Sequence, residues 1–140
     1  MEVLTKSEAE TFSLGRSLAG KLRGGEALLL SGELGAGKTV FTKGLAAGLG
    51  IAETITSPTY VFLRSYRGPQ LTLYHLDLYR IGGVGEADRI IFDDILADPR
   101  GIFAVEWPDF FPLKFFKVCY RVNFIHQRET ERLIKIGLEL

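Results

Sequence analysis

Leucines recur every fourth residue from Leu14 to Leu22, which places them on one face of a helix. Two overlapping capping-box sequences, Thr5–Glu8 and Ser7–Glu10, come just before this run. The glycine pair Gly24-Gly25 follows where such a helix would end. The pattern therefore predicts an amphipathic helix of about four turns, with its apolar face packed on a sheet.

Short apolar or aromatic runs, bounded by glycine, proline or polar turns, predict the strands. The predicted strands are Ala27–Leu30, Thr59–Tyr66, Leu71–Tyr79, Ile102–Val105, Val118–Ile125 and Leu133–Leu138. The turn at Arg67–Gln70 favours a β-hairpin between two of them, and a polar turn is expected at Gln127–Thr130. Two further helices are predicted over Lys38–Leu49 and Glu86–Ala97.

Length and composition fit one domain over residues 1–140, because 46% hydrophobic and 24% charged residues allow a packed core. Lys+Arg and Asp+Glu both total 17, so no overall field attracts a polyanion, and a stand-alone nucleic-acid-binding protein is not favoured. Cys119 is the only cysteine, which excludes an intrachain disulfide. With neither a signal-peptide pattern nor an apolar run near the roughly 20 residues of a membrane span, we expect a cytoplasmic protein without membrane contact.

The segment Gly32–Thr39 matches the phosphate-loop pattern G-x-x-x-x-G-K-[ST] at every position. Glycines let successive backbone N–H groups converge on phosphate oxygens, and the helix that follows directs its positive end at the same anion. Lys38 is expected to reach the β- and γ-phosphates, and the hydroxyl of Thr39 is expected to bind Mg²⁺. The expected nucleotide-binding residues in the loop are Gly32, Gly35, Ala36, Gly37, Lys38 and Thr39.

A chance glycine-rich turn is the alternative interpretation of this segment. A predicted buried strand precedes the loop and a predicted helix follows it, which is the context that a phosphate loop requires. We therefore favour a nucleotide site and expect an α/β fold of the P-loop NTPase type. Such a fold has three layers, with a central mixed β-sheet flanked by helices.

Hydrolysis of a nucleoside triphosphate also needs carboxylates that position Mg²⁺, and two acids are candidates. Glu106 directly follows the predicted strand Ile102–Val105, and Asp77 lies within Leu71–Tyr79. The alternative for each is a solvated carboxylate at a strand edge, which we favour less because the loop is present. We interpret His75 as a structural hydrogen-bonding residue in preference to a general base.

Hydroxyl side chains gather at Thr56–Thr59, between the predicted loop helix and the next strand. In P-loop proteins this position often carries a loop whose hydroxyl senses the γ-phosphate and Mg²⁺. Ser57 and Thr59 are the candidates for this switch-like role. A plain hydroxyl-rich turn before a strand explains the same residues, and both interpretations stay open.

Four motifs in one order and spacing resemble the bacterial TsaE family, also called YjeE, whose members are ATPases of tRNA threonylcarbamoyladenosine biosynthesis. The motifs are Gly32–Thr39, Ser57–Tyr60, His75–Arg80 and Glu106–Pro108. The resemblance covers roughly residues 5 to 110. It implies slow hydrolysis of Mg-ATP in support of threonylcarbamoyl transfer to adenosine 37 of tRNA. It also implies two protein partners, TsaD and TsaB, and contact with tRNA only through that complex.

The resemblance also implies roles for individual residues. Lys38, Asp77 and Glu106 would form the catalytic set, with Thr39 and Glu106 as the Mg²⁺ ligands. Trp107 would lie beside the nucleotide pocket. The resemblance also assigns Thr59 to the nucleotide-responsive loop. The aromatic pairs Phe110-Phe111 and Phe115-Phe116 depart from the family pattern and form either core or a docking surface, of which we favour core.

Three other classes of function compete with an ATPase. A small-molecule P-loop kinase is the main alternative, but the chain is short for a lid and an acceptor pocket. A GTP-dependent switch is disfavoured because the guanine motif Asn-Lys-x-Asp is absent. Asp98–Gly101 does match the switch pattern D-x-x-G, but it comes before a predicted strand, whereas the switch motif comes after one. The third is a module that binds nucleotide without turnover. We expect weak hydrolysis by the protein alone, since the sequence shows no obvious arginine finger.

Overall fold

The structure is a computed structural model that describes residues 1–33, 37–55, 63–77, 93–106, 116 and 118–139. Its described strands form one seven-stranded sheet in the order β1-β7-β6-β2-β5-β4-β3. The elements are β1 (Glu2–Thr5), α1 (Glu8–Ala19), β2 (Glu26–Ser31), α2 (Lys38–Gly48), β3 (Leu63–Arg67), β4 (Thr72–Asp77), β5 (Gly101–Glu106), β6 (Val118–Arg128) and β7 (Glu131–Glu139).

The middle of the sheet is parallel and both of its sides are antiparallel. Strand β2 pairs in parallel with β5 and with β6, and β4 pairs in parallel with β5. Strands β3, β7 and β1 are added antiparallel at the two sides. Because β2, β4, β5 and β6 run in the same direction, their carboxyl ends lie along one edge of the sheet. Ligands of α/β proteins bind at this kind of edge.

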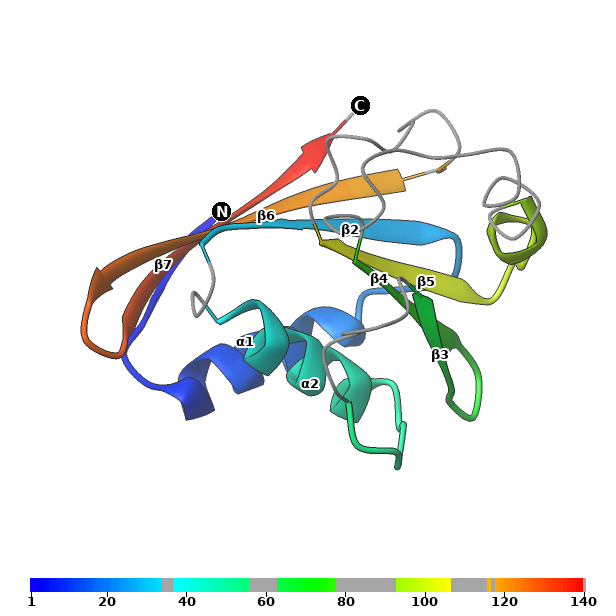
Figure 1. Ribbon diagram of the computed structural model, residues 1–140, viewed down its shortest axis with the longest axis horizontal. Coiled ribbons are helices and arrows are strands. Elements are labelled where there is room, and N and C mark those ends of the chain that lie inside the picture. The colour runs from blue at the N-terminus through cyan, green and yellow to red at the C-terminus, as the bar shows by residue number, and fades with distance from the viewer. Residues whose placement is uncertain (34–36, 56–62, 78–92, 107–115, 117, 140) are drawn as a thin grey trace.

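Helices α1 and α2 lie side by side against one face of the sheet (Figure 1). Leu28 and Leu30 of β2 pack toward them, together with Phe41 and Leu45 of α2, all of them fully buried. The opposite face carries a second apolar cluster around Leu29, which includes residues of the short helical segment 93–96. The expected three-layer α/β class with a mixed sheet is confirmed.

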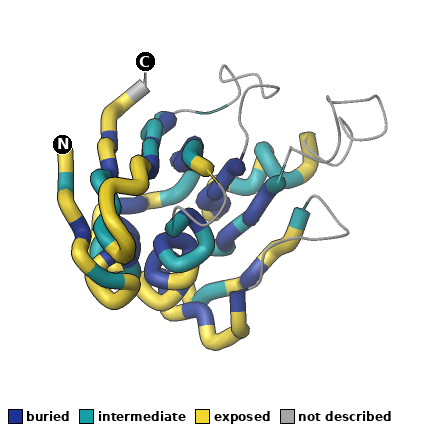
Figure 2. Tube along the Cα trace, turned by 60° about the vertical axis from the view of Figure 1, so that its left-hand side comes forward, coloured by how far each residue is buried: buried dark blue, intermediate teal, exposed yellow. Residues whose placement is uncertain are grey.

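Burial falls from the centre of the sheet toward its edges. The five residues Glu26–Leu30 of β2 and all six residues of β5 are buried. The outer strands β1 and β3 have one buried residue each and are otherwise exposed or half-buried, as the tube coloured by burial shows (Figure 2). A strand that is buried on both faces has a continuous run of apolar residues in its sequence, and this run made β2 and β5 predictable.

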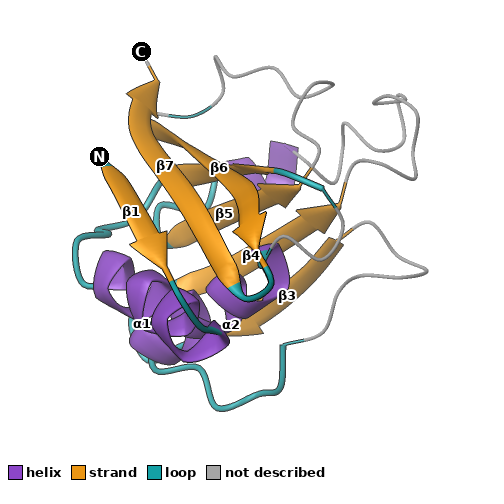
Figure 3. Cartoon of the chain, turned by 90° about the vertical axis from the view of Figure 1, so that its left-hand side faces the viewer, coloured by secondary structure: helices purple, strands orange, loops and turns teal. Residues whose placement is uncertain are grey.

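The two helices approach each other closely at glycines. A Cβ atom placed on Gly44 would lie 2.0 Å from the backbone oxygen of Phe12, and one on Gly15 would lie 2.2 Å from that of Phe41. Each glycine therefore lets one helix touch the backbone of the other. Figure 3 shows the two helices on the same side of the sheet. None of the helices in the described part of the chain is long and apolar enough to cross a membrane.

Most of the predicted elements are confirmed, with shifted ends. Of the two capping boxes, only Ser7–Glu10 caps α1: the backbone N–H of Glu10 donates to Ser7 Oγ at 3.1 Å. The alternative Thr5–Glu8 is wrong, because Thr5 is the last residue of β1. Strand β1 was not predicted. The residue Phe116 packs against the second apolar cluster, as the core interpretation expected, whereas 110, 111 and 115 lie outside the described residues.

Candidate active site

The phosphate-loop sequence lies at the carboxyl edge of the sheet, between β2 and α2. Gly32 follows the last residue of β2 with φ 145°, and Gly37 forms the N-cap of α2 with φ 100° and ψ 7°. Residues with a side chain rarely adopt these angles, so both positions need the glycines that the motif supplies. Gly35 and Ala36 lie outside the described residues, so the structure gives the backbone of the loop only at its two ends.

The amino end of α2 is prepared for an anion in a way that the end of α1 is not. In helix α1, Ser7 Oγ accepts from the backbone N–H of Glu10, and two glutamates lie in the first turn. Helix α2 begins at a glycine, has no side-chain cap and carries no acid in its first turn. No side chain of its own first turn offsets the positive end of its dipole, which suits an anion such as a phosphate.

Lys38 is folded into the site. Its side chain is 4% exposed, and its Nζ donates to the backbone oxygen of Gly32 at 2.8 Å. The same Nζ lies 3.9 Å from Oε1 of Glu106. A buried ammonium group is costly without partners, so these contacts hold a positive charge at the loop. The predicted lysine and the predicted strand-end carboxylate are therefore brought together.

Glu106 is the last residue of β5 and is 8% exposed. Its Oε2 lies 2.6 Å from Nε2 of His75, a fully buried residue of β4. With Glu106 ionised, the Nε2–H of the imidazole is the donor, since a carboxylate only accepts. His75 Nδ1 has no hydrogen-bond partner among the described residues. The hydrogen bond that was expected of His75 is present, and its partner is Glu106.

The sheet register places the acids in one row. Glu106 is the partner of Leu30 on β2 and of Asp77 on β4. Residues directly opposite each other on neighbouring strands project from the same face, so Asp77 and Glu106 both face the side on which α2 packs. Asp77 ends β4 half-buried. The sheet therefore positions both predicted carboxylates at the edge where the loop begins.

The residues at this edge fit a hard cation bound together with a phosphate group. In the described part of the chain, no cluster of three or more His, Cys, Asp or Glu side chains could hold a metal ion by itself. Mg²⁺ typically takes one or two protein oxygens and completes its shell with phosphate and water. Thr39, in the first turn of α2, and Glu106, at the end of β5, have oxygens of that kind.

One residue beside the loop was missed by sequence reasoning. A Cβ atom on Gly37 would lie 3.9 Å from Cγ of Arg132, which belongs to β7. Nη1 of Arg132 donates to the backbone oxygens of Glu129 and Glu131, at 2.7 and 3.0 Å. No motif marks this arginine, and only the strand order β7-β6-β2 brings it close to the loop.

The remaining sequence predictions fall into two groups. Ser57, Thr59 and Trp107 lie outside the described residues. The turn at Asp98–Gly101 precedes β5, where Gly101 N–H donates to the backbone oxygen of Asp98 at 3.0 Å. It lies at the amino ends of the parallel strands, so the interpretation of this motif as a plain turn is confirmed.

The mixed sheet, the strand–loop–helix unit and the buried lysine define a P-loop NTPase-like α/β protein. The family profile described as "Threonylcarbamoyl adenosine biosynthesis protein TsaE" matches residues 5–134. The chain belongs to this TsaE family.

Relatives named "tRNA threonylcarbamoyladenosine biosynthesis protein TsaE" agree with this assignment. The protein of Streptomyces coelicolor is 46% identical over 97 residues, which is 67% of this chain and 64% of that protein. The protein of Synechocystis is 41% identical over 80% of this chain and 73% of its own length. Among solved structures, the crystal structure of Bacillus subtilis YdiB matches with a TM-score of 0.75 at 30% identity, covering 97% of this chain and 83% of that one.

Proposed function

We propose that this protein binds Mg-ATP at the loop Gly32–Thr39 and hydrolyses it slowly, in support of the threonylcarbamoyl modification of tRNA adenosine 37. The observation that carries the proposal is the amino end of α2. It has no side-chain cap and no acid, and beside it lies a buried lysine that contacts a buried carboxylate. This combination suits a polyphosphate and a divalent cation together.

Each residue of the site has a task in this proposal. Lys38 would leave the backbone oxygen of Gly32 and bind the β- and γ-phosphates. Thr39 and Glu106 would hold Mg²⁺, and the ion would neutralise charge on the phosphates during transfer to water. His75 would orient the Glu106 carboxylate through their hydrogen bond. Asp77, the partner of Glu106 on the neighbouring strand, would act in the same site. None of the described residues is an evident base for the attacking water, which is consistent with slow turnover.

We further propose that TsaD and TsaB are the partners and that hydrolysis is stimulated in their complex. Membership of a threonylcarbamoyl adenosine biosynthesis family supports a role in that modification. The absence of an evident water-activating group among the described residues supports dependence on partners. Contact with tRNA would then be indirect, in line with the zero net charge of the chain.

The test is phosphate release from Mg-ATP by the protein alone and with TsaB and TsaD. We expect slow release alone and a clear increase with both partners. Glu106→Gln should abolish the release, because the amide cannot supply the negative charge that Mg²⁺ needs. Equal rates with and without the partners would contradict the partner-dependent ATPase. Transfer of label to a small-molecule acceptor would favour the kinase alternative.

A further inference from the structure

His75 is a fully buried polar residue whose contacts are explained by the site and not by the core. Its Nε2 lies 2.6 Å from Oε2 of Glu106. Its Nδ1 is also buried and has no hydrogen-bond partner among the described residues. A buried polar atom without a partner lowers the free energy of unfolding, so an apolar side chain would suit the core better than this imidazole. The contact with Glu106 is therefore the feature that accounts for a histidine here.

The sheet register brings the imidazole and the carboxylate together. Ala104 is the partner of His75 across the β4–β5 ladder, and Glu106 follows two residues later on β5. Residues two apart on a strand project from the same face, so His75 and Glu106 are diagonal neighbours within reach of each other. The rigid centre of the sheet thus fixes the position of the donor relative to the carboxylate.

The two oxygens of Glu106 have different neighbours. Oε2 accepts from His75, whereas Oε1 lies 3.9 Å from Nζ of Lys38 at the phosphate loop. The side chain of Glu106 is only 10% exposed, so it has little freedom to turn toward water. The carboxylate therefore directs Oε1 at the loop while the imidazole holds Oε2.

A carboxylate held in this way suits some cations better than others. Ca²⁺ takes about six to eight oxygen ligands and often binds both oxygens of one carboxylate. Mg²⁺ is smaller, takes about six ligands in a regular octahedron and completes its shell with phosphate and water. In the described part of the chain, no cluster of three or more His, Cys, Asp or Glu side chains could hold an ion by itself. With so few protein oxygens on offer, it matters whether Glu106 provides one or two.

We infer that His75 sets the preference of the nucleotide site for Mg²⁺ over Ca²⁺, because its hydrogen bond holds Oε2 of Glu106 and leaves Oε1 for the cation. The inference rests on the proposed Mg-ATP site and adds to it a residue that determines which cation is accepted. His75 is buried and acts through Glu106, so it is a positioning residue and not a metal ligand. Without the imidazole, Glu106 can turn both oxygens toward the cation, which favours Ca²⁺.

The test is calorimetric titration with Mg-ATP and, separately, with Ca-ATP, each with the metal in excess. We expect the wild type to bind Mg-ATP more tightly. His75→Leu has a side chain of similar size without a donor and should bind Mg-ATP about tenfold more weakly, as loss of a hydrogen bond to a metal-binding carboxylate typically does. Its affinity for Ca-ATP should stay the same or increase. His75→Gln can still donate to Oε2 and should keep most of the preference for Mg-ATP.

Tyr74→Phe is the matched control on the same strand. It removes a hydrogen bond to Asp98, 2.7 Å long, from a side chain that does not contact Glu106, and should keep the preference of the wild type. Thermal unfolding of each protein without nucleotide checks that its structure is retained. One measurement needs no variant: nuclear magnetic resonance should detect the hydrogen-bonded Nε2–H proton of His75 in the wild type, with and without Mg-ATP.

The outcomes separate this inference from the proposed function. If His75→Leu weakens both complexes equally, or leaves the preference unchanged, the role of His75 is only structural and the inference is overturned, while the Mg-ATP site stands. Loss of the Nε2–H signal when Mg-ATP binds would overturn it too, because Oε2 would then have left the imidazole. A wild type that binds neither complex would contradict the proposed function itself.

Discussion

At the scale of single residues, the contacts of Glu106 change what its substitution is expected to do. A strand-end carboxylate contributes little to a core, so the sequence alone predicts that Glu106→Ala weakens Mg²⁺-dependent turnover far more than it weakens the fold. The structure shows instead a residue that is 8% exposed, with a 2.6 Å hydrogen bond to the fully buried His75. Removing the carboxylate would leave Nε2 of His75 buried and unsatisfied.

We therefore predict that Glu106→Ala lowers the free energy of unfolding by about 1–3 kcal/mol, the cost of a buried polar group that loses its partner. Glu106→Gln keeps an acceptor for His75 and should cost less, although both variants should lose turnover. Urea denaturation measures the difference. Glu53→Ala, at an exposed position, is the control and should be close to neutral. Equal stability of Glu106→Ala and the wild type would contradict the buried pair.

Tyr74 gives a prediction for alkaline pH. Burial, followed by its hydrogen bond to Asp98, raises the pKa of Tyr74 from 10.0 to about 12. Because the folded state holds this proton more tightly than the unfolded state, the stabilisation is complete below pH 10.0 and is lost as the pH rises toward 12. Tyr74→Phe should remove this part of the alkaline loss of stability. Difference titration of phenolate absorbance between the two proteins measures the pKa, and a value near 10.0 would contradict the contact.

A feature of the site could be predicted when it depends on residues that are close together in the sequence. Lys38 and Gly37 belong to a contiguous motif whose geometry is local, so the sequence alone located them. Glu106 was found because it ends an apolar strand. Two features depend on which strands are neighbours, and residue types alone do not predict strand neighbours. They are the hydrogen bond between His75 and Glu106 and the position of Arg132 beside Gly37.

At the scale of elements, the contact between α1 and α2 is set by glycines that replace side chains. Gly44 has the backbone of Phe12 within 2.0 Å of where a Cβ would stand. Backbone cannot move aside as the end of a flexible side chain can, so an added methyl group must separate the helices. Because α2 carries the phosphate loop at its amino end, such a shift would also move the site.

We predict that Gly44→Ala destabilises the protein by about 1–3 kcal/mol, even though alanine favours helix by about 1 kcal/mol over glycine. Gly137→Ala on β7 is the matched control, since a Cβ there meets nothing within 4 Å. We expect its effect to stay within about 0.5 kcal/mol. Denaturant unfolding of the two variants compares them directly. A stabilised Gly44→Ala protein would show that the helices are not in close contact.

Elements were predicted where their patterns are long or strongly apolar. The central strands and the helices α1 and α2 were found, with ends shifted by one to a few residues. Of the predicted helix Glu86–Ala97, residues 93–96 are helical, and 86–92 lie outside the described residues. Strand β1 was missed because it has only four residues and its burial is irregular, so it lacks a clear alternation. The capping box was correctly identified at Ser7–Glu10, while the overlapping box failed because Thr5 is paired with Arg132 across the β1–β7 ladder.

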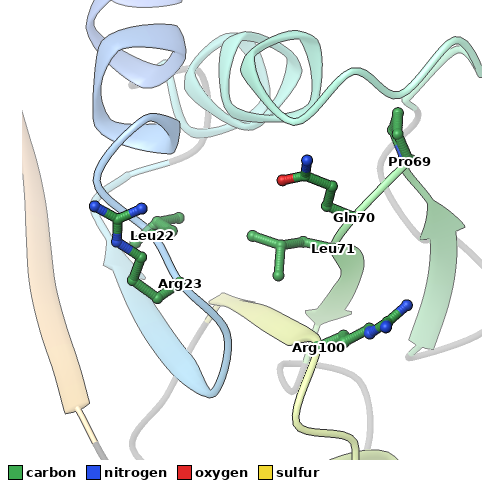
Figure 4. Close-up of a pocket in the computed structure, with 6 residues that line it drawn as sticks. All are labelled: Leu22, Arg23, Pro69, Gln70, Leu71 and Arg100. Atoms are coloured by element: carbon green, nitrogen blue, oxygen red, sulfur yellow. The ribbon is translucent and has the colours of Figure 1, made fainter.

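At the scale of the whole molecule, the strand order gives the two edges of the parallel strands different chemistry. The carboxyl edge gathers the phosphate loop, Glu106 and Asp77, while Arg23 and Arg100 line an open cavity at the amino edge (Figure 4). The α/β class was predictable from the sequence, but the order β1-β7-β6-β2-β5-β4-β3 was not, since the neighbour pairs β1–β7, β6–β2 and β2–β5 join strands that are not consecutive in the chain.

The most direct test of the central claim is calorimetric titration of the protein with Mg-ATP. We predict that the wild type binds and that Lys38→Ala abolishes measurable binding, because the buried ammonium group at the loop is lost. Lys43→Ala, an exposed lysine on the same helix, removes the same charge outside the site and should bind as the wild type does. Unchanged binding by Lys38→Ala, or no binding by the wild type, would contradict a phosphate site at the amino end of α2.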